Sequence, residues 1–139
     1  MTILLDTGPL VALLDRRDAF HAWSTEQAGL LSSPFHTCEA VLTEAFFLVR
    51  RLSNGPGQLI ELLQSNRIVC SFSYLTFDSR IHTLMQRYAN VPMSFADACL
   101  VCMAEQGERS VFTLEGDFRI YRLKRNKPIP LITPGRKAR

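Results

Sequence analysis

Five acidic side chains stand at sequence positions where a carboxylate is unusual: Asp6, Glu44, Asp97, Glu115 and Asp117. The first ends a short apolar run, and the last two follow another, as residues do at the ends of buried strands. The remaining two interrupt apolar stretches with helical spacing. Because an unpaired carboxylate is costly to bury, each of them needs a partner or a functional reason.

Asp97 shares the apolar side of a helix that the pattern predicts over residues 94–106. Apolar residues follow it at the helical spacings that place side chains on one face, so its carboxylate points along a buried stripe. Ser94 and Asp97 also have the spacing of a capping box. Capping explains an acid in the first turn, but not one on the buried face.

Glu44 lies in a strongly amphipathic helix predicted over residues 37–52, with Thr37 as its N-cap. It stands at the edge of the apolar stripe, beside Phe47 and Leu48. One interpretation is a functional carboxylate. The other is a stripe-edge residue whose stem covers apolar surface while its carboxylate reaches water.

Brought to one place, these acids would repel one another strongly, and a divalent cation is the usual remedy. An all-oxygen ligand set without His or Cys favours Mg²⁺ or Mn²⁺ over zinc. Such a cation with open coordination positions suits phosphoryl chemistry, because it binds a phosphate oxygen and activates water.

Asp6 considered by itself has a second interpretation. It can be an ordinary helix N-cap ahead of Thr7, Gly8 and Pro9.

The rest of the pattern indicates how the acids are positioned. Short apolar strands are predicted at residues 3–5, 68–70, 111–113 and 129–132, the last an edge strand because Pro130 cannot donate to a ladder. Helices are predicted at residues 10–14, 21–31, 37–52, 58–64, 77–88 and 94–106. This alternation is typical of an α/β fold with a parallel sheet, whose sites lie at the carboxyl ends of the strands.

The length of 139 residues predicts a single domain over residues 1–139. A content of 47% hydrophobic and 21% charged residues is typical of a globular protein.

The charge is unevenly distributed along the chain. Residues 1–118 carry 8 basic and 13 acidic side chains, whereas residues 119–139 carry 8 basic and no acidic ones. This basic C-terminal segment is a candidate for contacts with nucleic-acid phosphates.

No stretch of the sequence is long and apolar enough to cross a membrane, and no basic leader precedes Asp6. We therefore expect a cytoplasmic protein without a membrane partner.

Four cysteines fit a reducing compartment rather than a disulfide framework. Cys99 and Cys102 form a C-x-x-C inside an apolar helix, where core packing is expected rather than metal binding.

The motifs LLDTGPLVALLDRRD, TEAFFLV, SFADA and TLEGDF, in this order, resemble those of PIN-domain ribonucleases. The VapC-like toxins of bacterial and archaeal toxin–antitoxin operons are the most similar group. The resemblance extends over residues 6–118. It implies one three-layer α/β/α domain with a central parallel sheet and a Mg²⁺- or Mn²⁺-dependent endoribonuclease. It also implies an RNA substrate, a cognate antitoxin and a homodimer.

Matched to the motifs of the family, Asp6, Glu44, Asp97 and Glu115 are the implied catalytic acids, with Asp6 and Asp97 as metal ligands. The last motif of the family usually reads T-x-D-x-D-F, so Glu115 stands where an aspartate is usual. Asp117 keeps the second acidic position, or instead caps the turn that follows. The implied additional site residues are Asp117, Thr7, Ser94 and Thr113.

Two other interpretations belong to different functional classes. The first is a catalytically silent PIN fold that serves as a binding module. The second is a phospho-acceptor signalling domain, which would need an acidic pair before the acceptor strand and a lysine after a late strand; the sequence shows neither. A phosphatase of the haloacid-dehalogenase type would need a second aspartate where Gly8 stands.

Overall fold

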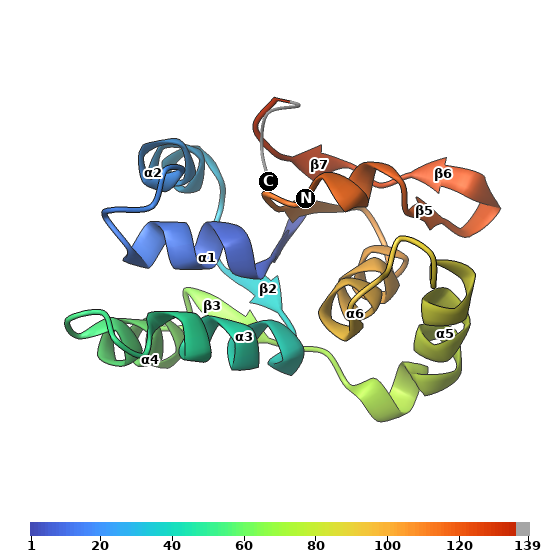
Figure 1. Ribbon diagram of the computed structural model, residues 1–139, viewed down its shortest axis with the longest axis horizontal. Coiled ribbons are helices and arrows are strands. Elements are labelled where there is room, and N and C mark those ends of the chain that lie inside the picture. The colour runs from blue at the N-terminus through green and yellow to red at the C-terminus, as the bar shows by residue number, and fades with distance from the viewer. Residues whose placement is uncertain (136–139) are drawn as a thin grey trace.

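The computed structural model describes residues 1–135 and is built around a five-stranded sheet (Figure 1). The strand order is β3-β2-β1-β4-β7, and every neighbouring pair is parallel. The predicted edge strand is confirmed as the last of these. The strands are β1 (Thr2–Leu5), β2 (Phe35–Thr37), β3 (Ile68–Cys70), β4 (Arg109–Phe112) and β7 (Leu131–Ile132).

Helices cover both faces of this sheet, which confirms the three-layer α/β/α architecture. In Figure 1, α1 to α4 lie to one side of the sheet, while α5 and α6 pack against each other on the other side. The helices are α1 (Thr7–Leu14), α2 (His21–Leu30), α3 (Glu39–Val49), α4 (Gly55–Gln64), α5 (Tyr74–Arg87) and α6 (Phe95–Ala104). No helix among the described residues is long and apolar enough to span a membrane.

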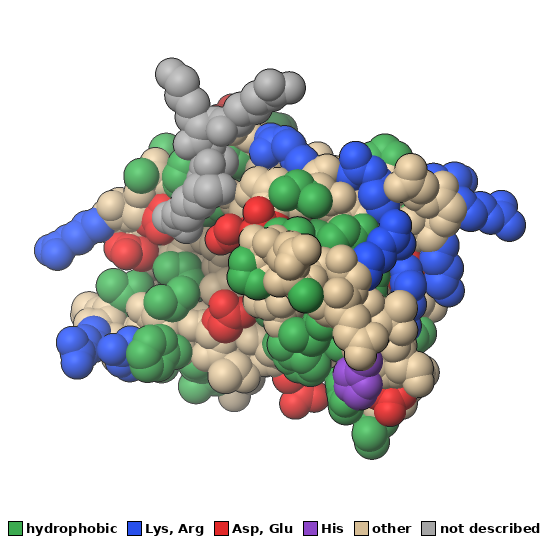
Figure 2. All heavy atoms as spheres, turned by 45° about the vertical axis from the view of Figure 1, so that its right-hand side comes forward, with side chains coloured by type: hydrophobic (Ala, Val, Ile, Leu, Met, Phe, Trp, Pro, Cys, Tyr) green, Lys and Arg blue, Asp and Glu red, His purple; other side chains and the backbone are tan. Residues whose placement is uncertain are grey.

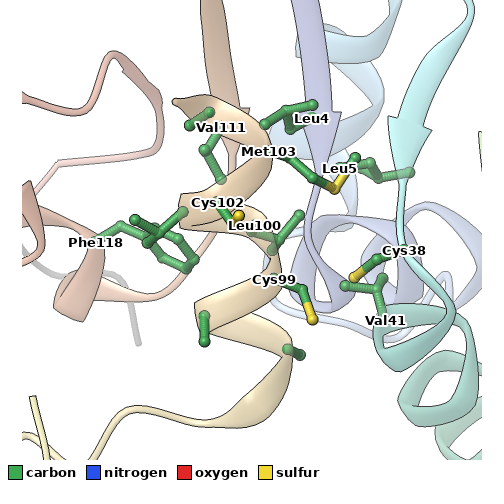
Figure 3. Packing of buried hydrophobic residues seen from close by; sticks show 14 of the residues in the cluster. Leu4, Leu5, Cys38, Val41, Cys99, Leu100, Cys102, Met103, Val111 and Phe118 are labelled. Atoms are coloured by element: carbon green, nitrogen blue, oxygen red, sulfur yellow. The ribbon is translucent and has the colours of Figure 1, made fainter. Parts of the chain in front are cut away.

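The core forms where β1 and β4 meet α6. Leu4, Leu5 and Val111 are fully buried (Figure 3), because central strands of a parallel sheet are covered on both faces. Every residue of α6 after its first, Phe95, is also buried. Cys99 and Cys102 are therefore free thiols in the core, as expected.

The prediction of Thr37 as a helix N-cap is wrong. Thr37 is the last residue of β2, and its buried hydroxyl donates to the carbonyl of Leu5 at 2.8 Å. Cys38, with extended backbone, takes the N-cap position of α3. Strand β2 was not predicted, because three residues are too few to show an alternating pattern beside a long amphipathic helix.

The basic segment contains an antiparallel hairpin that the sequence analysis also missed. After the 3₁₀ helix η1 (Gly116–Arg119), strand β5 (Arg122–Leu123) pairs with β6 (Lys127–Pro128) through the turn η2 (Lys124–Asn126). The turn gives no glycine signal, because Arg125 and Asn126 themselves adopt positive φ angles of 64° and 60°. The remaining cations of the predicted segment, Arg136, Lys137 and Arg139, lie outside the described residues.

Candidate active site

Asp6 follows β1 directly and serves as the N-cap of α1. Its Oδ1 accepts a hydrogen bond from the Thr7 amide at 2.7 Å, and its Oδ2 accepts one from the Thr113 hydroxyl at 2.6 Å. The side chain is buried, with 3% of its surface exposed. Asp6 is therefore both a helix cap and a buried carboxylate.

Thr113 and Glu115 reach Asp6 because β4 pairs with β1. Leu5 and Phe112 are partners in this parallel register, so the residues after each strand leave the same edge of the sheet. The Thr113 hydroxyl donates to Asp6 and accepts the Glu115 amide at 2.9 Å. It thereby connects the two strand ends.

Asp97 lies in the first turn of α6 and is 9% exposed. Its amide donates to Ser94 Oγ at 3.0 Å, so the predicted cap is present. The Tyr121 hydroxyl donates to Asp97 Oδ2 at 2.7 Å. Tyr121 is thus the partner that a buried carboxylate requires. Sequence reasoning missed it, because nothing in the pattern after residue 118 links a tyrosine to α6.

All five candidate acids line one pocket of about 250 Å³. Glu44 enters it from α3 as an exposed side chain, and Glu115 is exposed at its rim. Figure 2 shows acidic side chains around a hollow in this face of the molecule. The lining consists of Asp6, Thr7, Gly8, Glu44, Pro92, Ser94, Asp97, Glu115 and Asp117.

The acids influence one another electrostatically. Burial raises the pKa of Asp6 from 3.8 to about 7, against the hydrogen bonds of Thr113 and Thr7, and the charges of Asp97 and Glu115 raise it further. Burial also raises the pKa of Asp97, as does the charge of Asp117. The pKa of Glu44 is raised by burial and then by the charges of Asp97 and Glu115. The pocket therefore concentrates negative charge, which a bound cation would relieve.

The polar atoms of the pocket fit a hard divalent cation. The donors are all oxygens, and Thr7 Oγ1 is buried there without a hydrogen-bond partner in the described structure. Among residues 1–135, no group of three His, Cys, Asp or Glu side chains is already arranged to hold a metal ion. The all-oxygen donor set suits Mg²⁺, which keeps several waters and takes only one or two carboxylates.

The family model of the PIN domain matches residues 3–124. The chain belongs to the PIN-domain family. The family resemblance of the motifs is thereby confirmed.

One solved structure similar to this PIN domain is VapC20 of Mycobacterium tuberculosis, described as a toxin that cleaves the sarcin–ricin loop. The two share 20% sequence identity with a TM-score of 0.74, over 84% of this chain and 92% of that one. The likeness shows a common fold. No curated protein matches the sequence significantly.

Asp117 does not act as the turn cap that the sequence suggested. The 3₁₀ helix η1 has Glu115 as its N-cap residue and no side-chain capping hydrogen bond. Asp117 supports the turn through its backbone carbonyl, which accepts the amides of Ile120 and Tyr121. The Asp117 carboxylate instead lines the pocket, where its charge raises the pKa of Asp97.

Removing the Tyr121 hydroxyl should measure how much its hydrogen bond to Asp97 stabilises this PIN domain. We expect Tyr121→Phe to lower the free energy of unfolding by roughly 1.5–3 kcal/mol at pH 8, because a buried carboxylate loses a hydrogen bond. Urea unfolding measures the change. Tyr74→Phe is the matched control, since the Tyr74 hydroxyl bonds His82 on an exposed surface. Equal losses in the two variants would contradict the role assigned to Tyr121.

Proposed function

We propose that this PIN domain is a Mg²⁺- or Mn²⁺-dependent endoribonuclease and the toxin of a toxin–antitoxin pair. The observation that carries the proposal is the convergence of five acids, from four separate segments of the chain, on one pocket. Two of them, Asp6 and Asp97, are buried and have raised pKa values. The fold alone would not require carboxylates there, so their burial favours a catalytic site over a silent binding module.

Four of the acids have a proposed role. Asp6 and Asp97 would hold the cation, which when bound supplies positive charge for the phosphate and lowers the pKa of water. Glu115 is the proposed fourth acid of the site, and its charge acts on Asp6. Thr113 keeps the Asp6 carboxylate in place, and Tyr121 does so for Asp97. Glu44 faces the open side of the pocket with a raised pKa, which suits a group that accepts a proton from water.

RNA is the proposed substrate, and the basic hairpin is its proposed electrostatic contact. Lys124, Arg125 and Lys127 are exposed around the β5–β6 turn. Figure 2 shows Lys and Arg side chains gathered on the hairpin side of the acidic hollow. VapC20, which has a similar fold, is described as a toxin that cleaves the sarcin–ricin loop, and this description supports the proposed RNA substrate.

A cognate antitoxin and a second copy of the chain are the proposed protein partners, as the family resemblance implies. Exposed apolar side chains support a homodimer. They lie on α3, α5 and α6, and the rings of Tyr74 and Phe95 contact each other at 5.7 Å between centroids. The exposed residues are Phe47, Leu48, Tyr74, Leu75 and Phe95.

The decisive test is cleavage of a labelled single-stranded RNA by the purified chain, with Mn²⁺ or Mg²⁺ and with excess chelator. We expect cleavage that requires the metal and produces internal cuts. RNA binding without cleavage in either metal would instead identify a silent binding module. Copurification with a coexpressed neighbouring gene product would test the antitoxin separately.

Neutralising the hairpin should reduce the salt dependence of RNA binding. We expect the combined change of Lys124, Arg125 and Lys127 to Gln to flatten the slope of log K against log salt by about 2, since each phosphate contact on a single strand contributes about 0.7. Fluorescence anisotropy across a salt series measures the slope. The control changes Arg16, Arg17 and Arg51 to Gln. These three exposed cations lie around a separate pocket. An unchanged slope in the hairpin variant would exclude the hairpin from RNA binding.

The structure sharpens the comparison of the two acids after β4. The charge of Glu115 acts on Asp6 and Glu44, whereas that of Asp117 acts on Asp97. We expect Glu115→Gln to lower the cleavage rate about 100-fold, as for the loss of one group stabilising developing charge, and Asp117→Asn to lower it less. Single-turnover cleavage measures both rates.

Glu115→Asp is the companion variant, because it retains the charge and shortens the side chain by one methylene. A faster rate would mean that the natural glutamate weakens the site. The reverse order of effects, with Asp117→Asn inactive and Glu115→Gln nearly normal, would transfer the fourth acidic role to Asp117.

A further inference from the structure

Two buried cysteines face each other where the start of α3 meets α6. Cys38 precedes α3 and is 1% exposed, and Cys99 lies in the middle of α6 and is 2% exposed. Figure 3 shows their sulfur atoms pointing toward one another across the contact between the two helices. No other pair among the cysteine sulfurs labelled there is placed in this way.

Cys38 occupies the position at which a thiolate is best stabilised. It is the N-cap residue of the eleven-residue helix α3, whose first amides carry the positive end of the helix dipole. The Cys99 thiol lowers the pKa of Cys38, and the amides of Val41 and Ala40 lower it further, against the effect of burial. Cys38 is therefore the more nucleophilic member of the pair.

A pocket at the surface borders both cysteines. Cys38 and Cys99 both line this pocket of about 270 Å³, and the rest of its lining is Glu39, Ala40, Phe72, Tyr74 and Phe95. Cys102, one turn further along α6, is also buried but does not line this pocket. The pocket thus selects one cysteine of α6 over the other.

We propose that Cys38 and Cys99 form a redox-active pair that a peroxide converts to a disulfide joining α3 and α6. The Cys38 thiolate attacks one peroxide oxygen, the O–O bond breaks, and Cys38 becomes a sulfenic acid while the other oxygen leaves as water or alcohol. The Cys99 sulfur then attacks Cys38 Sγ. The S–O bond breaks, and the hydroxide leaves as water with the proton of Cys99. The two thiols lose two electrons, which the peroxide gains.

The test is a non-reducing tryptic map of the full chain after treatment with hydrogen peroxide and blocking of free thiols. Arg and Lys positions place Cys38 in peptide 18–50, Cys70 in peptide 68–80, and Cys99 with Cys102 in peptide 88–109. We expect peptides 18–50 and 88–109 to become linked, two of the four thiols to be lost, and dithiothreitol to reverse both changes. The wild-type map needs no variant and no nuclease activity.

Variants then assign the sulfur atoms. We expect Cys38→Ser and Cys99→Ser each to abolish the linked species, and the matched control Cys102→Ser to retain it. Circular dichroism checks that each variant is folded. A disulfide within peptide 88–109, a link through Cys70, or equal linkage in the Cys99→Ser and Cys102→Ser proteins would overturn the proposal. Loss of the Cys70 thiol alone, with the other three thiols retained, would also overturn the proposal.

Discussion

Replacing Asp6 by Asn should lower the rate of RNA cleavage about 100- to 1,000-fold, the range seen when one group that stabilises developing charge is removed. Asp6 is the most buried of the five acids that line the pocket. It follows the central strand β1 directly, and the charges of Asp97 and Glu115 act on it. An amide keeps the size of the side chain but removes its negative charge.

The same substitution should leave the protein as stable or more stable. Asn can still accept the Thr7 amide at the start of α1, so the cap is preserved. The raised pKa of Asp6 means that its charge opposes folding. Raising it from 3.8 to about 7 corresponds to roughly 4 kcal/mol at a pH above both values. Loss of activity with gain of stability would separate a functional acid from a structural one.

The pH dependence of unfolding gives an independent measurement. Between about pH 4 and 7 the folded chain holds a proton on Asp6 that the unfolded chain releases. The contribution of Asp6 therefore makes the wild type less stable as pH rises through this window, and it becomes constant above the folded pKa. We expect urea unfolding of Asp6→Asn to lack this contribution. Asp15→Asn, at the other end of α1, is the control and should follow the wild type.

Equal pH profiles of unfolding for wild type and Asp6→Asn would show that folding does not raise the pKa of the Asp6 carboxyl. A normal cleavage rate in Asp6→Asn would contradict the proposed site itself. The two results are separable, because the first is measured without RNA or metal.

Much of the site could be predicted from the sequence because parallel sheets obey a simple rule. Asp6 and Glu115 each follow an apolar strand, and adjacent parallel strands deliver such residues to the same edge. Asp97 was identifiable because a carboxylate on an apolar helical face needs an explanation. These inferences use local patterns whose consequences are fixed by backbone geometry.

The parts that could not be predicted depend on contacts between distant segments. Tyr121 reaches Asp97 only because η1 turns the chain back over α6, and no periodicity reports that turn. Thr37 carries a normal helix-capping signal, yet its hydroxyl bonds the neighbouring strand. In both cases a side chain had several local options, and tertiary packing selected one.

Adding millimolar Mn²⁺ or Mg²⁺ should stabilise the wild-type protein, and Asp97→Asn should abolish that response. A ligand that binds only the folded state contributes RT ln(1 + [L]/Kd), or about 1–3 kcal/mol well above Kd, which amounts to several degrees of melting temperature. Burial and the charge of Asp117 raise the pKa of Asp97, so neutralising it should leave the metal-free protein at least as stable.

The structure makes this test specific to charge. In Asp97→Asn the amide oxygen can still accept the Tyr121 hydroxyl, and the backbone amide can still donate to Ser94, so both neighbours keep their hydrogen bonds. Asp78→Asn, on α5 and outside the lining of the acidic pocket, is the matched control and should retain the full metal response. The melting temperature is measured with and without the cation in all three proteins. If Asp97→Asn responds as strongly as the wild type, the cation binds without Asp97, and the acids of α6 and β1 do not share a metal site.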